Sequence, residues 1–164
     1  MIIGSPYRFS IFVEAIQEWN AEGSHLKNGV FLLCIDGELF PKQIVTSTFD
    51  IDIVWLKKDL SNITVNRDLF TMEKEKAFVK MYNITFPEWS HNDYQYFISS
   101  PSLEDYNCIA FVVSNGEQVR IMAAKLNYII EESTHDLGNM DISETFITHD
   151  ELNKIILELD NVIV

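Results

Sequence analysis

Residues 107–126, NCIAFVVSNGEQVRIMAAKL, predict a β-hairpin. An apolar run at 107–113 is followed by Ser-Asn-Gly at 114–116, and a second run continues over 117–126. β-Branched and aromatic residues favour strands, and an Asn-Gly pair between two such runs favours a tight turn. We therefore expect an antiparallel pair of strands here, and we assign the neighbouring elements outward from it.

The N-terminal part predicts a second hairpin. Residues 7–19 partly alternate between apolar and polar side chains, which favours a strand, and a polar loop follows at 20–29. The apolar run 30–35 is joined to 38–40 by Asp36-Gly37. This dipeptide favours a type I′ turn, because both central residues of that turn need a positive φ.

Three segments have helical spacing of their apolar residues: 48–61, 71–82 and 150–161. The last has a capping box, Thr148 and Glu151, which satisfies two backbone amides of the first turn. The apolar residues that we expect to bury this helix are Leu152, Ile156 and Leu159.

Shorter elements complete the assignment. We expect a short strand at 94–98, a break at the Ser-Ser-Pro-Ser segment 99–102, and another strand at 142–147. Residues 127–132 are expected to extend the preceding strand, and 135–140 to interrupt the chain before the next one.

Hairpins and helices without regular βαβ alternation indicate the α+β class. We expect a single domain over residues 1–164, with a largely antiparallel sheet built from hairpins and a few packed helices, including the capped C-terminal helix. A helix-rich fold with only two hairpins remains an alternative.

The composition excludes several functions. Asp and Glu number 25 against 12 Lys and Arg, a net charge of -13, and no basic stripe is present, so we expect no direct binding to nucleic acid. No run of about 18 apolar residues exists, so we expect no membrane span. The first residues lack the pattern of a signal peptide, which favours a cytoplasmic protein.

No catalytic, metal or phosphate-binding motif is visible, and we expect no cofactor and no metal. The two cysteines, Cys34 and Cys108, lie in apolar runs and are expected to be buried free thiols; a disulfide is the alternative. A stable monomer or weak dimer follows from the adequate core.

The charge is uneven along the chain. From residue 127 onward there are nine acidic residues and one lysine, which account for -8 of the net -13. Either the protein is generally acidic, or these residues form a negative surface for a cationic partner. The candidate partner-binding residues are the acids Glu131, Glu132, Asp136, Asp141 and Glu144, with Tyr94, Tyr96 and Tyr106 as aromatic anchors.

The N-terminal quarter resembles a known family, in the segments 4–9 (GSPYRF), 18–20 (EWN), 27–31 (KNGVF) and 35–42 (IDGELFPK). It is similar to the immunity protein 42 family of bacterial polymorphic-toxin and contact-dependent inhibition systems, over roughly residues 1–45. The resemblance implies a non-enzymatic protein that binds and neutralises the C-terminal domain of a cognate toxin inside the cell that makes it. An acidic inhibitor suits a basic toxin, such as a nuclease.

Two other functions stay open. An acidic adaptor or secretion chaperone would have the same composition and would bind an effector without abolishing its activity. A small enzyme could assemble a site from scattered residues such as His91, Asp93 and Tyr94.

Overall fold

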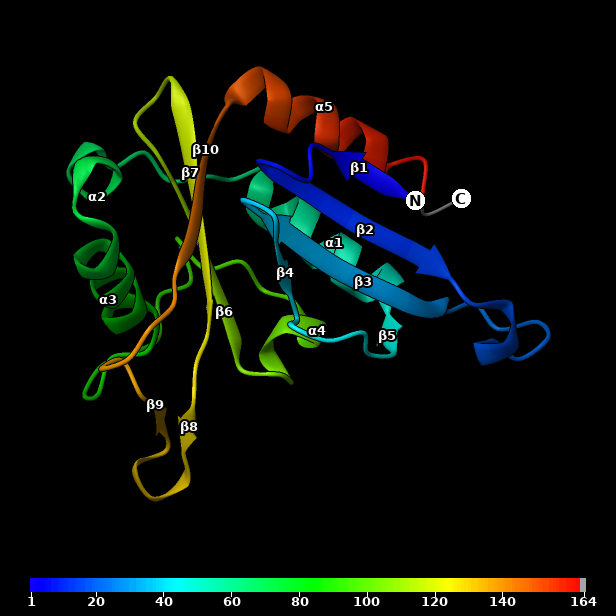
Figure 1. Ribbon diagram of the computed structural model, residues 1–164, viewed down its shortest axis with the longest axis horizontal. Coiled ribbons are helices and arrows are strands. Elements are labelled where there is room, and N and C mark those ends of the chain that lie inside the picture. The colour runs from blue at the N-terminus through cyan, green and yellow to red at the C-terminus, as the bar shows by residue number, and fades with distance from the viewer. Residues whose placement is uncertain (163–164) are drawn as a thin grey trace.

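The computed structural model describes residues 1–162 and places two antiparallel sheets at its centre (Figure 1). The first sheet has the order β1-β2-β3-β4, with β5 paired to β3. Its strands are β1 (Ile2–Gly4), β2 (Phe9–Ala15), β3 (Asn28–Ile35), β4 (Glu38–Phe40) and β5 (Ser47–Thr48). The second sheet has the order β10-β7-β6, from β6 (Cys108–Ser114), β7 (Gln118–Lys125) and β10 (Ser143–Thr148).

Helices cover both sheets. In Figure 1, α5 lies along β1, α1 lies behind β2 and β3, and α2 and α3 lie on the other side of the second sheet. Their bounds are α1 (Phe49–Leu60), α2 (Arg67–Thr71), α3 (Lys74–Thr85), α4 (Pro101–Glu104) and α5 (His149–Leu159). The α+β class with antiparallel sheets is therefore confirmed. In residues 1–162, no helix has the length and apolar character needed to cross a membrane.

The hairpin predicted at 107–126 is confirmed as β6 and β7, which pair in register with Val112 opposite Ile121. Side chains alternate across the pleat, so neighbouring residues of β6 enter different cores. Ala110 and Val112 belong to one cluster, whereas Ile109 and Phe111 belong to the other. The second sheet is therefore a wall shared by two cores.

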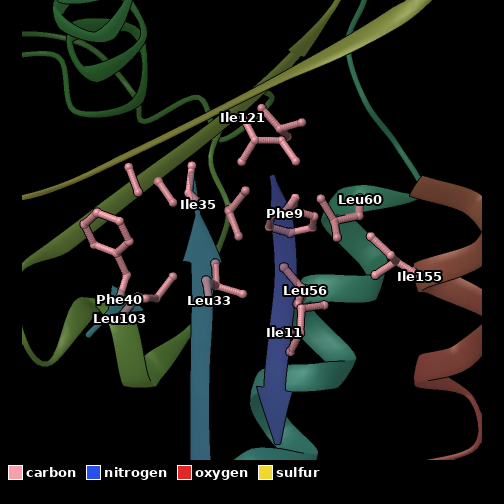
Figure 2. Packing of buried hydrophobic residues seen from close by; sticks show 14 of the residues in the cluster. Phe9, Ile11, Leu33, Ile35, Phe40, Leu56, Leu60, Leu103, Ile121 and Ile155 are labelled. Carbon is pink, nitrogen blue, oxygen red and sulfur yellow. The ribbon is translucent and has the colours of Figure 1, made fainter. Parts of the chain in front are cut away.

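The first core fills the space between the two sheets. Figure 2 shows Phe9 and Ile11 of β2 gathered with Leu56 of α1, near Ile121 of β7. The two predicted thiols, Cys34 and Cys108, are both buried and unpaired, as expected.

The second core lies on the opposite face of the shared sheet, against α2 and α3. The rings of Phe78 and Phe111 meet edge to face with centroids 5.0 Å apart. This face also buries Arg120, whose guanidinium pairs with Glu144 at 2.7 Å. Its Nη1 donates to the carbonyl oxygens at the end of α2, those of Leu69, Phe70 and Met72, at 2.7–3.1 Å.

A second buried charge fixes α1. The carboxylate of Asp52 accepts hydrogen bonds from the hydroxyls of Ser47, Ser100 and Ser102 and from the backbone amide of Ser102. One carboxylate therefore joins β5, α1 and the start of α4. A buried charge needs this degree of hydrogen bonding to be tolerated.

The helix expected at 71–82 is wrong at its start. Asn66 caps a separate helix, α2, by accepting from the backbone amide of Leu69. The chain is extended at Met72, and α3 then runs from Lys74 to Thr85. Arg120 provides the physical reason, because it takes up the carbonyl oxygens that a continuous helix would have bonded internally.

Three further expectations for the first two-thirds of the chain are corrected. The strand expected at 7–19 ends at Ala15, where pairing with β3 stops, and Gln17–Trp19 forms a 3-10 turn. Residues 94–98 form no strand, only one bridge between Phe97 and Phe111. The expected break at 99–102 contains the start of α4, because Ser100 accepts from Leu103 and Pro101 suits the first helical turn.

The expectation that 127–132 extends β7 is also wrong. The chain forms a small separate hairpin from β8 (Tyr128–Ile129) and β9 (Thr134–His135), joined by a 3-10 turn at Ile130–Glu132. In Figure 1 this hairpin projects beyond the end of the shared sheet.

Two local signals are confirmed in detail. Asp36 and Gly37 have φ angles of 51° and 81°, as a type I′ turn requires. Thr148 and Glu151 form the reciprocal capping box of α5. In that helix Leu152 and Leu159 are buried as expected, but Ile155 rather than Ile156 completes the buried face, since Ile156 is half-buried.

We expect Leu152→Ala and Leu159→Ala each to lower the free energy of unfolding by about 2–5 kcal/mol, because each leaves a cavity in the first core. Leu157→Ala, on the exposed side of the same helix, is the control and should change it by less than about 0.5 kcal/mol. Urea denaturation measures all three. Similar values for the buried and exposed positions would show that α5 does not dock as described.

Arg120→Ala should cost about 3–5 kcal/mol, because it leaves Glu144 and three carbonyl groups without their partner. Arg8→Ala removes the arginine of an exposed pair with Glu151 and should cost no more than about 1 kcal/mol. Thermal and urea unfolding of the two variants compare a buried with an exposed Arg–Glu pair, and equal losses would contradict the role given to Arg120.

Candidate functional site

The β8–β9 hairpin faces the end of α3 and the segment that follows it, and a groove of about 1100 Å³ lies between them. We call it the α3–β9 groove. One wall consists of Tyr82, Asn83, Phe86, Pro87, Glu88 and Asn92. The other wall consists of Tyr128, Ile129, Glu132, Ser133, Thr134, His135, Asp136 and Leu137.

A hydrogen-bond network holds the two walls in register. The hydroxyl of Tyr82 lies 2.8 Å from His135 Nδ1 and accepts from the His135 backbone amide at 3.2 Å. His135 Nε2 lies 3.2 Å from the amide oxygen of Asn107, which can only accept, so the proton sits on Nε2. The Tyr82 hydroxyl then donates to Nδ1. Burial lowers the pKa of His135, which favours this neutral imidazole.

Aromatic rings surround this network. Tyr82 contacts Phe86 and His135 contacts Tyr128, with ring centroids 5.0 and 5.2 Å apart. Tyr94 extends the series, 6.4 Å from Phe86. Tyr94 and Tyr128 are 53% and 48% exposed, so both present ring surface to an approaching molecule.

Carboxylates occupy both sides of the same groove. Glu88 lies on the α3 side and Glu132 on the hairpin side, and both are exposed. Asp136 is half-buried, and one of its oxygens accepts from the backbone amide of Gly138. In the part of the chain that is described, none of these three carboxylates forms an ion pair. The α3–β9 groove therefore carries both unpaired negative charge and exposed aromatic surface.

The structure gathers only some of the expected partner-binding residues here. Glu132 and Asp136 line the groove, Glu131 is exposed beside Glu132 on the hairpin turn, and Asp141 is exposed farther along the chain. Tyr94 is exposed at the neighbouring segment.

Three of the expected residues lie elsewhere. Glu144 pairs with the buried Arg120. Tyr96 is only 4% exposed, and its hydroxyl accepts from Asn66, so its ring belongs to the second core. Tyr106 is half-buried against the first core. These side chains stabilise the fold and offer little or no surface to a partner.

Three of the acids after residue 127 are neutralised by bases from elsewhere in the chain. Besides the pair of Glu144 with Arg120, Glu151 pairs with Arg8 and Asp160 with Lys57. Each base comes from a distant part of the chain, so local sequence did not reveal it. In the described residues, Glu131, Glu132, Asp136 and Asp141 at or near the hairpin have no ion pair, and neither do Asp150 and Glu158 on α5.

Sequence reasoning missed Tyr82, Phe86, Tyr128 and His135 as parts of one site. Tyr82 lies on a helix that was predicted, and Phe86 directly follows α3, but the hairpin residues Tyr128 and His135 are more than 40 residues away and on a hairpin that was not predicted. The run Tyr-Ile-Ile-Glu-Glu at 128–132, with apolar and acidic residues side by side, is the local signal that could have directed attention to this segment.

The residues considered for an enzyme do not converge. His91, Asp93 and Tyr94 are all exposed; Asp93 accepts from Gln95, and the Tyr94 hydroxyl accepts from Asn92. Across residues 1–162 no three His, Cys, Asp or Glu side chains are grouped as metal ligands. The chemistry that the α3–β9 groove offers is the binding of positive charge, by carboxylates and by the faces of aromatic rings.

Comparison with known proteins identifies a solved structure with the same fold and the family of the chain. No curated protein sequence matches the chain. The crystal structure of CdiI from Burkholderia dolosa AUO158 matches with a TM-score of 0.76 and 20% sequence identity, over 99% of this chain and 99% of that one. It therefore has the same fold. The family described as immunity protein 42 matches residues 1–162, and the chain belongs to that family.

Proposed function

We propose that this protein binds the C-terminal domain of a cognate toxin and neutralises it. The observation that carries the proposal is the family match over residues 1–162, which makes the chain an immunity protein of a bacterial toxin system. The whole chain acts as one immunity domain, in the cytoplasm of the cell that makes it, as a monomer or weak dimer. It acts by binding and not by catalysis.

The toxin domain that fits this protein is a basic one, such as a nuclease. The net charge of -13 attracts a cationic partner over distances beyond contact. A nuclease must itself carry positive charge around its cleft, because it holds phosphates. The unpaired acids of the β8–β9 region, Glu131, Glu132 and Asp136, supply a local part of this field, whereas Glu144, Glu151 and Asp160 nearer the C-terminus are neutralised in ion pairs.

The direct test uses the C-terminal domain of the toxin encoded immediately upstream. Purified with this protein, that domain should form a 1:1 complex in size-exclusion chromatography and lose its toxicity in cells that co-express both. A complex that leaves the activity of the toxin domain intact would instead support an adaptor or secretion chaperone. No complex at all would overturn the proposal.

Reversing four charges together, Glu131→Lys, Glu132→Lys, Asp136→Lys and Asp141→Lys, should slow association with that toxin domain at low salt and weaken protection of cells. Electrostatic steering raises association rates by about 10-fold or more and is screened by salt, so the difference from wild type should shrink as salt is raised. Stopped-flow or surface-plasmon measurements give the rates.

The matched control reverses four exposed acids outside the region: Glu18, Glu22, Asp105 and Glu117. It changes the net charge by the same amount. If both quadruple variants slow association equally, only the net charge matters and the acidic surface has no special position. Circular dichroism and melting temperature establish that each variant is folded.

A further inference from the structure

We propose that the α3–β9 groove receives an arginine side chain carried on a loop of the toxin domain. The inference rests on the proposed function and assigns the contact at its centre. It concerns the shape and chemistry of the groove, and it is separate from the general attraction between an acidic protein and a basic one.

The lining of the groove matches a guanidinium group in two respects. Glu88 and Glu132 line the groove from its two different segments, so the lining offers carboxylates to a cation from both. Tyr128 and Phe86 also line the groove, each in ring contact with a member of the Tyr82–His135 network, and Tyr128 is 48% exposed. A planar guanidinium can bond a carboxylate with two N–H groups and stack on a ring at once, which the compact ammonium of lysine cannot do.

The carboxylates of Glu88 and Glu132 are free to bind a cation from outside the protein. No ion pair to Glu88 or Glu132 forms in the described residues, and the imidazole of His135 is committed to Tyr82 and Asn107. Both carboxylates are exposed and unpaired, so they are available to a cation that a partner brings. At about 1100 Å³ the groove has room for several side chains, which suits a protruding loop better than a small cation.

A second depression adjoins the α3–β9 groove and indicates how the toxin loop would lie across the surface. A depression of about 720 Å³ continues along α3 and shares Asn83 and Leu137 with the groove. It is lined by Lys76 and Lys80 together with Glu75. A loop lying along both would place its arginine between Glu88 and Glu132, and an acidic or polar residue near Lys80.

Single charge reversals at adjacent positions separate the groove from the general field. Glu132→Lys and Glu88→Lys should each weaken the affinity for the upstream-encoded toxin domain by at least about tenfold, chiefly through faster dissociation. Glu131→Lys, next to Glu132 but outside the groove lining, and Glu117→Lys, at the β6–β7 turn, carry the same charge change. Both should lower affinity by less than about threefold.

A second set of variants tests the contribution of the Tyr128 ring and of the toxin arginine. Tyr128→Phe keeps the ring face and should bind like wild type, whereas Tyr128→Ala should lose about tenfold or more. Each arginine of the toxin domain is then changed to Ala and to Lys. One of them should lose affinity in both forms, and its effect should not add to that of Glu132→Gln in a double-mutant cycle.

The outcomes distinguish the two proposals. If wild type binds and neutralises the toxin domain but Glu132→Lys and Glu131→Lys behave alike, the groove inference is wrong and the proposed function stands. The same holds if folded Tyr128→Ala binds normally, or if no toxin arginine couples to Glu132. If wild type fails to bind the toxin domain, the proposed function fails first. Melting temperatures of all variants, compared with wild type, separate lost contacts from lost folding.

Discussion

The rest of the structure depends on the burial of the β10-β7-β6 sheet on both faces. A sheet buried on one face needs polar residues on alternate positions, whereas this one needs apolar residues at nearly every position. β6 is apolar up to its last residue, Ser114, and the buried part of β7, residues 119–124, is apolar except at Arg120. That arginine is accommodated because Glu144 on β10 and the end of α2 satisfy its charge and its donors. The same contact fixes where α2 stops, and hence where α3 begins.

The position of the groove follows from this arrangement. The pairing of β6 with β7 ends at the hydrogen bond from the Leu126 amide to the Asn107 carbonyl oxygen. Beyond this bond, the chain after β7 has no neighbouring strand of the β10-β7-β6 sheet to pair with. Residues 128–135 therefore form a hairpin of their own, which contacts α3 through the hydrogen bonds between Tyr82 and His135. α3 is held in turn by Phe78 against Phe111 in the second core. A projecting, aromatic-lined surface is thus held against the second core.

Ion pairs decide which of the many acids remain available. Arg8, Lys57 and Arg120 each neutralise an acid near the C-terminus from elsewhere in the chain. The pairs with Arg8 and Lys57 tie the two ends of α5 to the segment before β2 and to α1, and the pair with Arg120 joins β10 to β7. The hairpin acids Glu131, Glu132 and Asp136 form no ion pair in the described residues, so unpaired negative charge lies beside the groove. An immunity protein gains association rate from such a field, while its residence time depends on closer contacts.

The sequence by itself determined the elements whose signals are local. The Asp36-Gly37 turn, the β6–β7 hairpin and the Thr148–Glu151 capping box depend on residues within a few positions of each other, and all three appear as expected. The membership of the family was also indicated by short N-terminal segments, and it is confirmed over residues 1–162. Tertiary structure alone decided the break between α2 and α3, the self-pairing of β8 with β9, and which acids are neutralised. Each of these depends on groups far apart in the chain, Arg120 with Leu69 or His135 with Tyr82, and no spacing within a segment encodes such a meeting.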